Sequence, residues 1–142
     1  LTWPPLMTQQ YTLFSYPGPD PNAEDSVATT GQIWERDAER FLLRQGLVLL
    51  TRNFLTRSGE IDLIMRDQNL IVFVEVRFRK ASRFGGALHS INRHKKTCVV
   101  RCASLFLQQN PQWSHHPCRF DVIAYDGNAA TTDPRWIQAA FN

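Results

Sequence analysis

The sequence predicts an α/β fold in which helices flank a mixed central sheet. Two segments place apolar residues at helical spacing, and short strand-like runs bounded by turn residues lie between and after them. The chain has 142 residues, of which 43% are hydrophobic, enough for one packed domain and too few for two. The predicted order is α-β-β-β-α-β, followed by a candidate edge strand.

The first 30 residues differ from the rest and predict an extended, flexible arm ahead of a single domain at 31–142. They contain five prolines, and proline interrupts regular helices and strands. They also lack the basic start and unbroken apolar stretch of a signal peptide. No apolar run approaches the roughly 20 residues that cross a bilayer. We therefore expect a cytoplasmic protein without a membrane partner, and its three cysteines favour reduced thiols.

The first helix is expected over 33–45, with Thr30 as its cap and Gly46 ending it. A strand over 47–53 follows, then two strands over 60–66 and 70–79. Gln68 and Asn69 form the two-residue turn between those two strands. Further on, the pattern predicts a helix over 90–109, a strand over 119–125 and an edge strand over 135–141.

The hairpin places acids within two otherwise apolar strands. With a turn at residues 68 and 69, Asp62 faces Glu75, and Glu60 faces Arg77. Two carboxylates about 5 Å apart repel each other unless a cation lies between them, and Mg²⁺ or Mn²⁺ binds such oxygens. A register shifted by one residue would separate the two acids onto opposite faces. The alternative is a structural ion pair of Glu75 with Arg77 or Arg79.

Positive charge dominates the second half of the chain. No acid occurs between Glu75 and Asp121, a stretch that holds nine lysines and arginines. Such a stretch is typical of a polyanion-binding surface, although a solvated helix face is an equally good explanation.

Several short motifs resemble those of the YraN-like family of small bacterial proteins, which are predicted endonucleases. The matching segments cover residues 31–125 and are residues 31–35, 52–53, 59–64, 73–79, 83–85, 95–96 and 119–122. The resemblance implies a restriction-endonuclease-like fold of the kind found in Holliday-junction resolvases.

The resemblance also implies a role for each matching residue. Asp62 and Glu75 would bind Mg²⁺ or Mn²⁺ with the carbonyl of Val76, and Glu35 on the first helix would assist. Arg77 stands where the superfamily has lysine; it can hold a phosphate but cannot act as a general base. The implied reaction is phosphodiester hydrolysis on a nucleic acid, with DNA favoured over RNA. The residues expected to contact backbone phosphates are Arg79, Lys80, Arg83, Arg93, Lys95 and Lys96.

Three alternatives stay open. Arg77 favours a non-catalytic nucleic-acid-binding or assembly module on a degenerate nuclease fold. A zinc site could use residues on one stripe of the second helix, but no Cys-x-x-Cys motif supports it. A homodimer follows only by analogy with the fold. The zinc candidates are His94, Cys98, Cys102, His115, His116 and Cys118.

Overall fold

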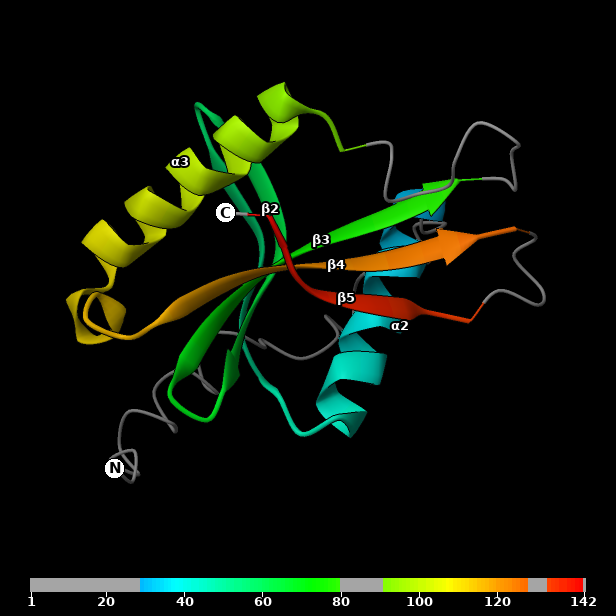
Figure 1. The fold of residues 1–142 in the computed structure, drawn as a ribbon, viewed down its shortest axis with the longest axis horizontal. Helices are drawn as coiled ribbons and strands as arrows, with labels where there is room; N and C mark the ends of the chain where they lie inside the picture. The colour runs from blue at the N-terminus through cyan, green and yellow to red at the C-terminus, as the bar shows by residue number, and fades with distance from the viewer. Residues whose placement is uncertain (1–28, 80–90, 128–132, 142) are drawn as a thin grey trace, which may run out of the picture.

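The computed structural model describes residues 29–79, 91–127 and 133–141, which form one five-stranded sheet with a long helix on each face (Figure 1). Of the arm expected over residues 1–30, only Thr29 and Thr30 are described, and they cap and begin α2. Lys80 and Arg83 lie outside the described residues. The strands lie side by side in chain order. The elements are α2 (Thr30–Arg44), β1 (Val48–Thr56), β2 (Gly59–Asp67), β3 (Leu70–Arg79), α3 (Arg93–Gln109), a 3₁₀ turn (Pro111–Trp113), β4 (Cys118–Asp126) and β5 (Arg135–Phe141).

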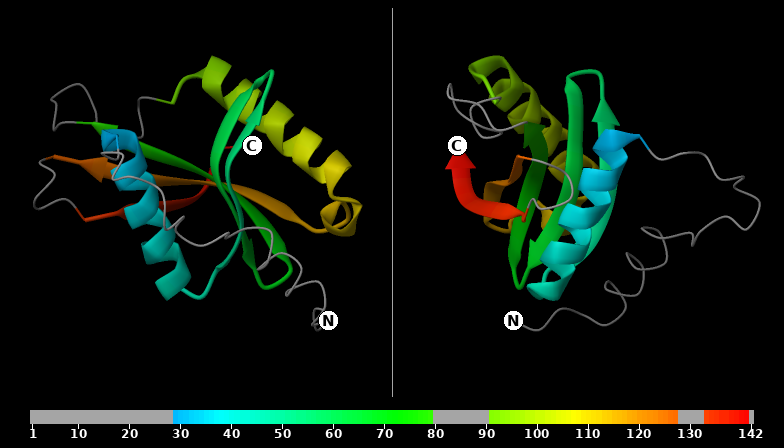
Figure 2. Two further views of the ribbon diagram at one scale, coloured as in Figure 1. Left: turned by 180° about the vertical axis from the view of Figure 1, so that it is seen from behind. Right: turned by 90° about the vertical axis from the view of Figure 1, so that its right-hand side faces the viewer.

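The sheet is mixed, as the sequence predicts. The pairs β1–β2, β2–β3 and β4–β5 are antiparallel, whereas β3 and β4 are parallel. Parallel neighbours need a crossover connection, and α3 lies in that connection. Seen along the sheet, α2 and α3 cover opposite faces (Figure 2). Within the described residues, no helix is long and apolar enough to span a membrane.

Helix α2 begins three residues earlier than predicted, and its cap is Thr29 instead of Thr30. The Thr29 side chain accepts a hydrogen bond from the backbone N–H of Gln32, and the Gln32 side chain accepts one from Thr29. This reciprocal pair is a capping box. At the other end Gly46 adopts a φ of 94°, and the backbone N–H of Leu47 donates to the carbonyl of Leu42. Gly46 thus ends the helix, as expected, in a Schellman motif.

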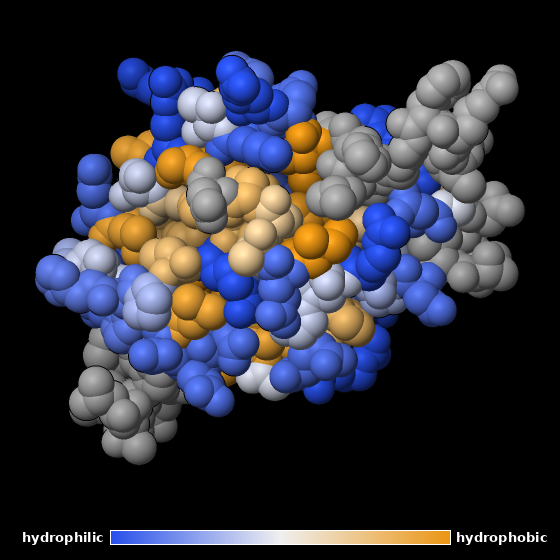
Figure 3. Space-filling model, in the orientation of Figure 1, coloured by the Kyte–Doolittle hydropathy of each residue, from blue (hydrophilic) through white to orange (hydrophobic). Residues whose placement is uncertain are grey.

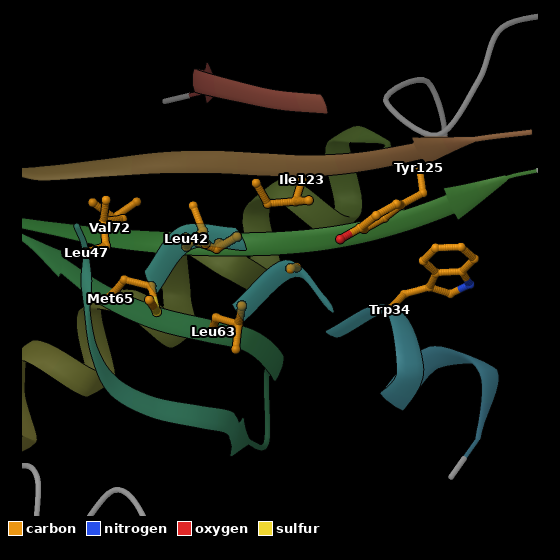
Figure 4. Packing of buried hydrophobic residues seen from close by; sticks show 10 residues of the cluster. Trp34, Leu42, Leu47, Leu63, Met65, Val72, Ile123 and Tyr125 are labelled. Carbon is orange, nitrogen blue, oxygen red and sulfur yellow. The ribbon is translucent and has the colours of Figure 1, made fainter. Parts of the chain in front are cut away.

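Each helix packs on its own apolar cluster. Beneath α2, Trp34, Ala38 and Leu42 pack on strand residues that include Leu63, Val74 and Tyr125 (Figure 4). Beneath α3, the buried side chains include Val99, Cys102 and Phe106 from the helix and Ile61, Ile64 and Phe73 from the sheet. Side chains of β3 alternate between the two clusters, which is the period of a strand buried on both faces.

The edge strand β5 is held by Asp121 of β4. The carboxylate of Asp121 is completely buried and accepts two hydrogen bonds from Arg119, one from the indole of Trp136 and one from the backbone of Ala139. Beside α3, the end of β5 adds half-buried apolar side chains to a surface that is apolar in its centre (Figure 3). Asp121 is therefore a structural acid, although it lies in one of the motifs that resemble the YraN-like family.

Candidate functional site

The predicted hairpin register is present, and it ends where the acids begin. Five pairs from Asp67–Leu70 to Leu63–Val74 follow that register. Asp62 and Glu75 come next on their strands, but the registered pairs do not include them. There β2 continues beside β1, whereas β3 continues beside β4 (Figure 1). The expected direct pairing of the two acids is thus replaced by a fork between β2 and β3.

Asp62 lies in this fork. One of its carboxylate oxygens accepts a hydrogen bond of 2.8 Å from the backbone N–H of Val76. That N–H faces the edge of β3 from which β2 has separated, so the side chain of Asp62 takes the place of a strand partner. Since the bond spans the fork, it fixes Asp62 relative to the β3 segment that carries Glu75.

Glu35 reaches the fork from α2, and its carboxyl hydrogen-bonds Asp62. Asn53 of β1 supports it. With its side-chain amide turned so that both contacts are favourable, the amide nitrogen donates to Glu60 at 2.8 Å and to Glu35 at 3.1 Å. Asn53 has a φ of 48°, a left-handed conformation in which asparagine is enriched. Glu35 is half-buried and therefore lies against the sheet.

Glu75 points to the α3 face of the sheet, where its partner is Lys95. The ammonium of Lys95 lies 3.3 Å from Oε2 of Glu75, whose side chain is only 2% exposed. The expected alternative partners, Arg77 and Arg79, make no such ion pair among the described residues. Oε1 of Glu75 is buried and accepts no hydrogen bond from any described residue. A buried carboxylate oxygen without a donor is rare and calls for a ligand or a proton.

The electrostatics of the three acids agree with this geometry. Burial, with the charges of Asp62 and Glu60, raises the pKa of Glu35 from 4.5 to about 7. Burial also raises the pKa of Asp62, although the Val76 hydrogen bond and Lys95 act against it. Burial and the charge of Asp62 raise the pKa of Glu75 to about 8. Burial thus makes the charged forms of these three acids costly, and their mutual repulsion adds to that cost at Glu35 and Glu75.

Arg77 follows Glu75 on the same face of β3 and is half-buried. Its Nε is buried and donates no hydrogen bond within the described part of the chain. Its charge acts on both Asp62 and Glu75. A guanidinium with a free buried donor beside two acids can bind an anion there.

Four of the predicted phosphate-contacting residues are described. Arg79 and Arg93 are exposed, and Lys96 is half-buried with its ammonium 5.9 Å from the ring centre of Phe141. Lys95 differs from them because it points to Glu75.

The residues described contain no group of three or more histidines, cysteines, aspartates or glutamates arranged to hold a metal ion. The zinc site that the histidine and cysteine pattern suggested is therefore not supported by the described residues. His94 contacts Cys98 at 3.6 Å, but Cys102 turns to Thr56 and Cys118 to the carbonyl of His116. The carboxylate site is different in kind, since only Asp62 and Glu75 were expected to supply side-chain ligands.

Sequence reasoning missed the roles that two residues have at this site. Asn53 was assigned no role, although an asparagine inside an apolar strand is a local signal for a left-handed conformation. Lys95 was expected to contact phosphate, and no local pattern could indicate its ion pair with Glu75 because the two residues lie 20 positions apart.

Comparison with known proteins places the site within a family. The sequence profile described as "Uncharacterised protein family UPF0102" matches residues 34–125, which include every residue of the fork. The UPF0102 protein of Pseudomonas putida strain GB-1 is 48% identical over 117 residues, covering 82% of this chain and 95% of that protein. The UPF0102 protein of Ectopseudomonas mendocina strain ymp is 47% identical over 112 residues, covering 79% and 93%.

Proposed function

The chain belongs to the UPF0102 family, the YraN-like family that its motifs indicated, and from its fork we propose a metal-dependent endonuclease that hydrolyses nucleic-acid phosphodiesters. The proposed fold assignment is restriction-endonuclease-like. The observation that carries the proposal is the convergence of Glu35, Asp62 and Glu75 at the point where β2 and β3 separate. An acid cluster of this kind costs stability, so its presence favours a function.

The donor set fits a hard divalent cation. Mg²⁺ needs oxygen ligands and commonly takes only one or two carboxylates, with water completing its shell. Oε1 of Glu75 has no hydrogen-bond donor among the described residues, and Asp62 is held on the other side of the fork. The N–H and carbonyl of one strand residue lie on the same edge, so the Val76 carbonyl would also face the fork. Asp62, Glu75 and Val76 would therefore hold Mg²⁺ or Mn²⁺.

A bound divalent ion would supply a water of lowered pKa and a polarised phosphoryl oxygen. The protein's own groups would position the substrate. The buried Nε of Arg77 would donate to a non-bridging oxygen of the scissile phosphate and stabilise charge that develops there. Glu35 would keep Asp62 in place through their hydrogen bond. Arg79, Arg93 and Lys96 would contact flanking phosphates and so align the strand without selecting a sequence.

Calorimetric titration with Mn²⁺ tests the metal site. We expect the parent to bind Mn²⁺ and Asp62→Ala to lose that binding, whereas Asp133→Ala, which removes an exposed carboxylate, should bind like the parent. If the parent takes up no Mn²⁺, or if Asp62→Ala binds equally well, the proposal fails. Incubation with branched, duplex and single-stranded DNA plus Mn²⁺ then tests cleavage, with Glu75→Ala as the control for contaminating nucleases.

The second candidate is a non-catalytic nucleic-acid-binding module on a nuclease-like fold. Arg77 favours it, because an arginine cannot exchange a proton near neutral pH and the usual lysine can. Such a module would bind duplex DNA in a salt-dependent way in the parent and in Glu75→Ala alike, with no cleavage by either. The cleavage assay separates the two candidates.

A further inference from the structure

Lys95 occupies an unusual place for a lysine. It lies in the first turn of α3, where Asn92 caps its backbone N–H at 2.8 Å. The positive end of a helix dipole disfavours cations in that turn, and α3 has no acid there to offset them. The ammonium instead points to Glu75, with 3.3 Å between Nζ and Oε2. The ion pair with Glu75 is thus what compensates for the unfavourable position.

Lys95 and Arg77 differ in how they are held. The Nε of Arg77 is buried next to the acids, whereas 28% of the Lys95 side chain is exposed. A lysine has a long flexible stem and a strongly hydrated head, so Lys95 can turn its ammonium out to water at small cost. Arg77 has no such exit for its Nε. Of these two cations, Lys95 is the one that can leave the site.

We infer that Lys95 is an exchangeable counter-cation, whose ammonium neutralises Glu75 until a divalent metal ion takes that carboxylate. The inference rests on the proposed metal site and adds a residue that opposes metal uptake. Both cations need the same carboxylate, and a divalent ion on Glu75 would repel an ammonium that stayed within a few ångströms. Metal uptake therefore includes the work of breaking the Lys95–Glu75 pair, and Lys95 tunes the metal affinity of the fork.

Mn²⁺ calorimetry on Lys95→Gln tests this directly, because removing the competitor should tighten binding. We expect Mn²⁺ affinity to rise roughly tenfold, which corresponds to about 1.4 kcal/mol. Lys95→Met, which keeps the apolar stem, should show the same gain if glutamine disturbs folding. Arg101→Gln is the matched control: it removes one positive charge from an exposed position of α3, about 9 Å further along the helix axis, and should leave the affinity unchanged.

The outcomes separate this inference from the proposed function. Mn²⁺ binding that is tighter in both Lys95 variants than in the parent supports it. Equal or weaker binding overturns the inference and leaves the metal site intact, since it would mean that Lys95 is neutral or helps to hold the ion. If neither the parent nor any variant binds Mn²⁺, the metal site and the exchange fail together. An equally large gain in Mn²⁺ affinity in Arg101→Gln would show that the effect comes from the net charge of the protein. That result would also overturn the inference.

Discussion

Glu75 should destabilise the protein in the absence of metal, and its replacement by glutamine should reveal by how much. The side chain is buried, and its pKa is raised from 4.5 to about 8, chiefly by burial and then by the charge of Asp62. An acid with a raised pKa binds its proton more tightly in the folded state than in the unfolded chain. The stabilising contribution of this proton to the free energy of unfolding is therefore fully present below pH 4.5, and it is lost as the pH rises toward 8.

The size of the effect follows from the width of that interval. Each pH unit in which only the folded state holds the proton costs 1.36 kcal/mol, so the upper limit is about 5 kcal/mol. Because Asp62 and Glu75 act on each other's charge and the unfolding free energy is shared between them, we expect about 2 to 3 kcal/mol. A glutamine at this position does not titrate, so Glu75→Gln loses this pH dependence. Lys95, which then lacks its ion-pair partner, is partly exposed and can be solvated. The variant should match the parent near pH 5 and exceed it by that amount at pH 8.

Urea denaturation in EDTA at pH 5, 6.5 and 8 measures the difference, with Asp133→Asn as a control that removes an exposed carboxylate. The control should follow the parent at every pH. A Glu75→Gln protein that is less stable than the parent at pH 8 would refute the reasoning, because Glu75 would then be a net stabilising ion-pair partner of Lys95. A constant gain at all three pH values would point to packing and not to charge.

Three further predictions concern other parts of the molecule. Asp121→Asn should lower the free energy of unfolding by about 3 kcal/mol, since one buried carboxylate accepts four hydrogen bonds; a loss below 1 kcal/mol in urea would contradict this. Tyr125→Phe should cost about 1 kcal/mol by removing the 2.6 Å hydrogen bond to Asp37, and an unchanged urea midpoint would disprove that cost. Arg93→Gln should reduce the salt dependence of duplex DNA binding by about one counterion, measured as the slope of log affinity against log salt; an equal slope would remove Arg93 from the interface.

Local rules predicted much of the fold. The two-residue turn at Gln68 and Asn69 fixed the β2–β3 register, since any shift by one residue would have exposed an apolar face. Glycine at position 46 marked the end of α2 because a left-handed residue is needed there. The cap of α2 was misplaced by one residue because Thr29 and Thr30 are both acceptable caps, and only the contact with Gln32 distinguishes them.

The fork was beyond such rules. Where β2 leaves β3 depends on contacts with the rest of the fold, and β4 begins 39 residues after β3 ends. A hairpin considered alone would continue its pairing through Asp62 and Glu75, as the sequence suggested. In the structure the Val76 N–H donates to the Asp62 side chain instead of to a strand partner. Lys95 was unpredictable for the same reason, since its target is set by how α3 lies on the sheet.

If the fork binds a metal ion as proposed, it requires both an arginine and a lysine beside these acids. A permanently neutralised pair of carboxylates would be stable but could not bind a metal ion, and an unneutralised pair would weaken the fold. Arg77, with its Nε buried, supplies positive charge that cannot leave, while the half-exposed Lys95 supplies charge that can. Replacing the lysine with an arginine should therefore separate their roles. In Lys95→Arg, the guanidinium should compete with metal more strongly than the lysine ammonium does, because a guanidinium can hold a carboxylate through two hydrogen bonds.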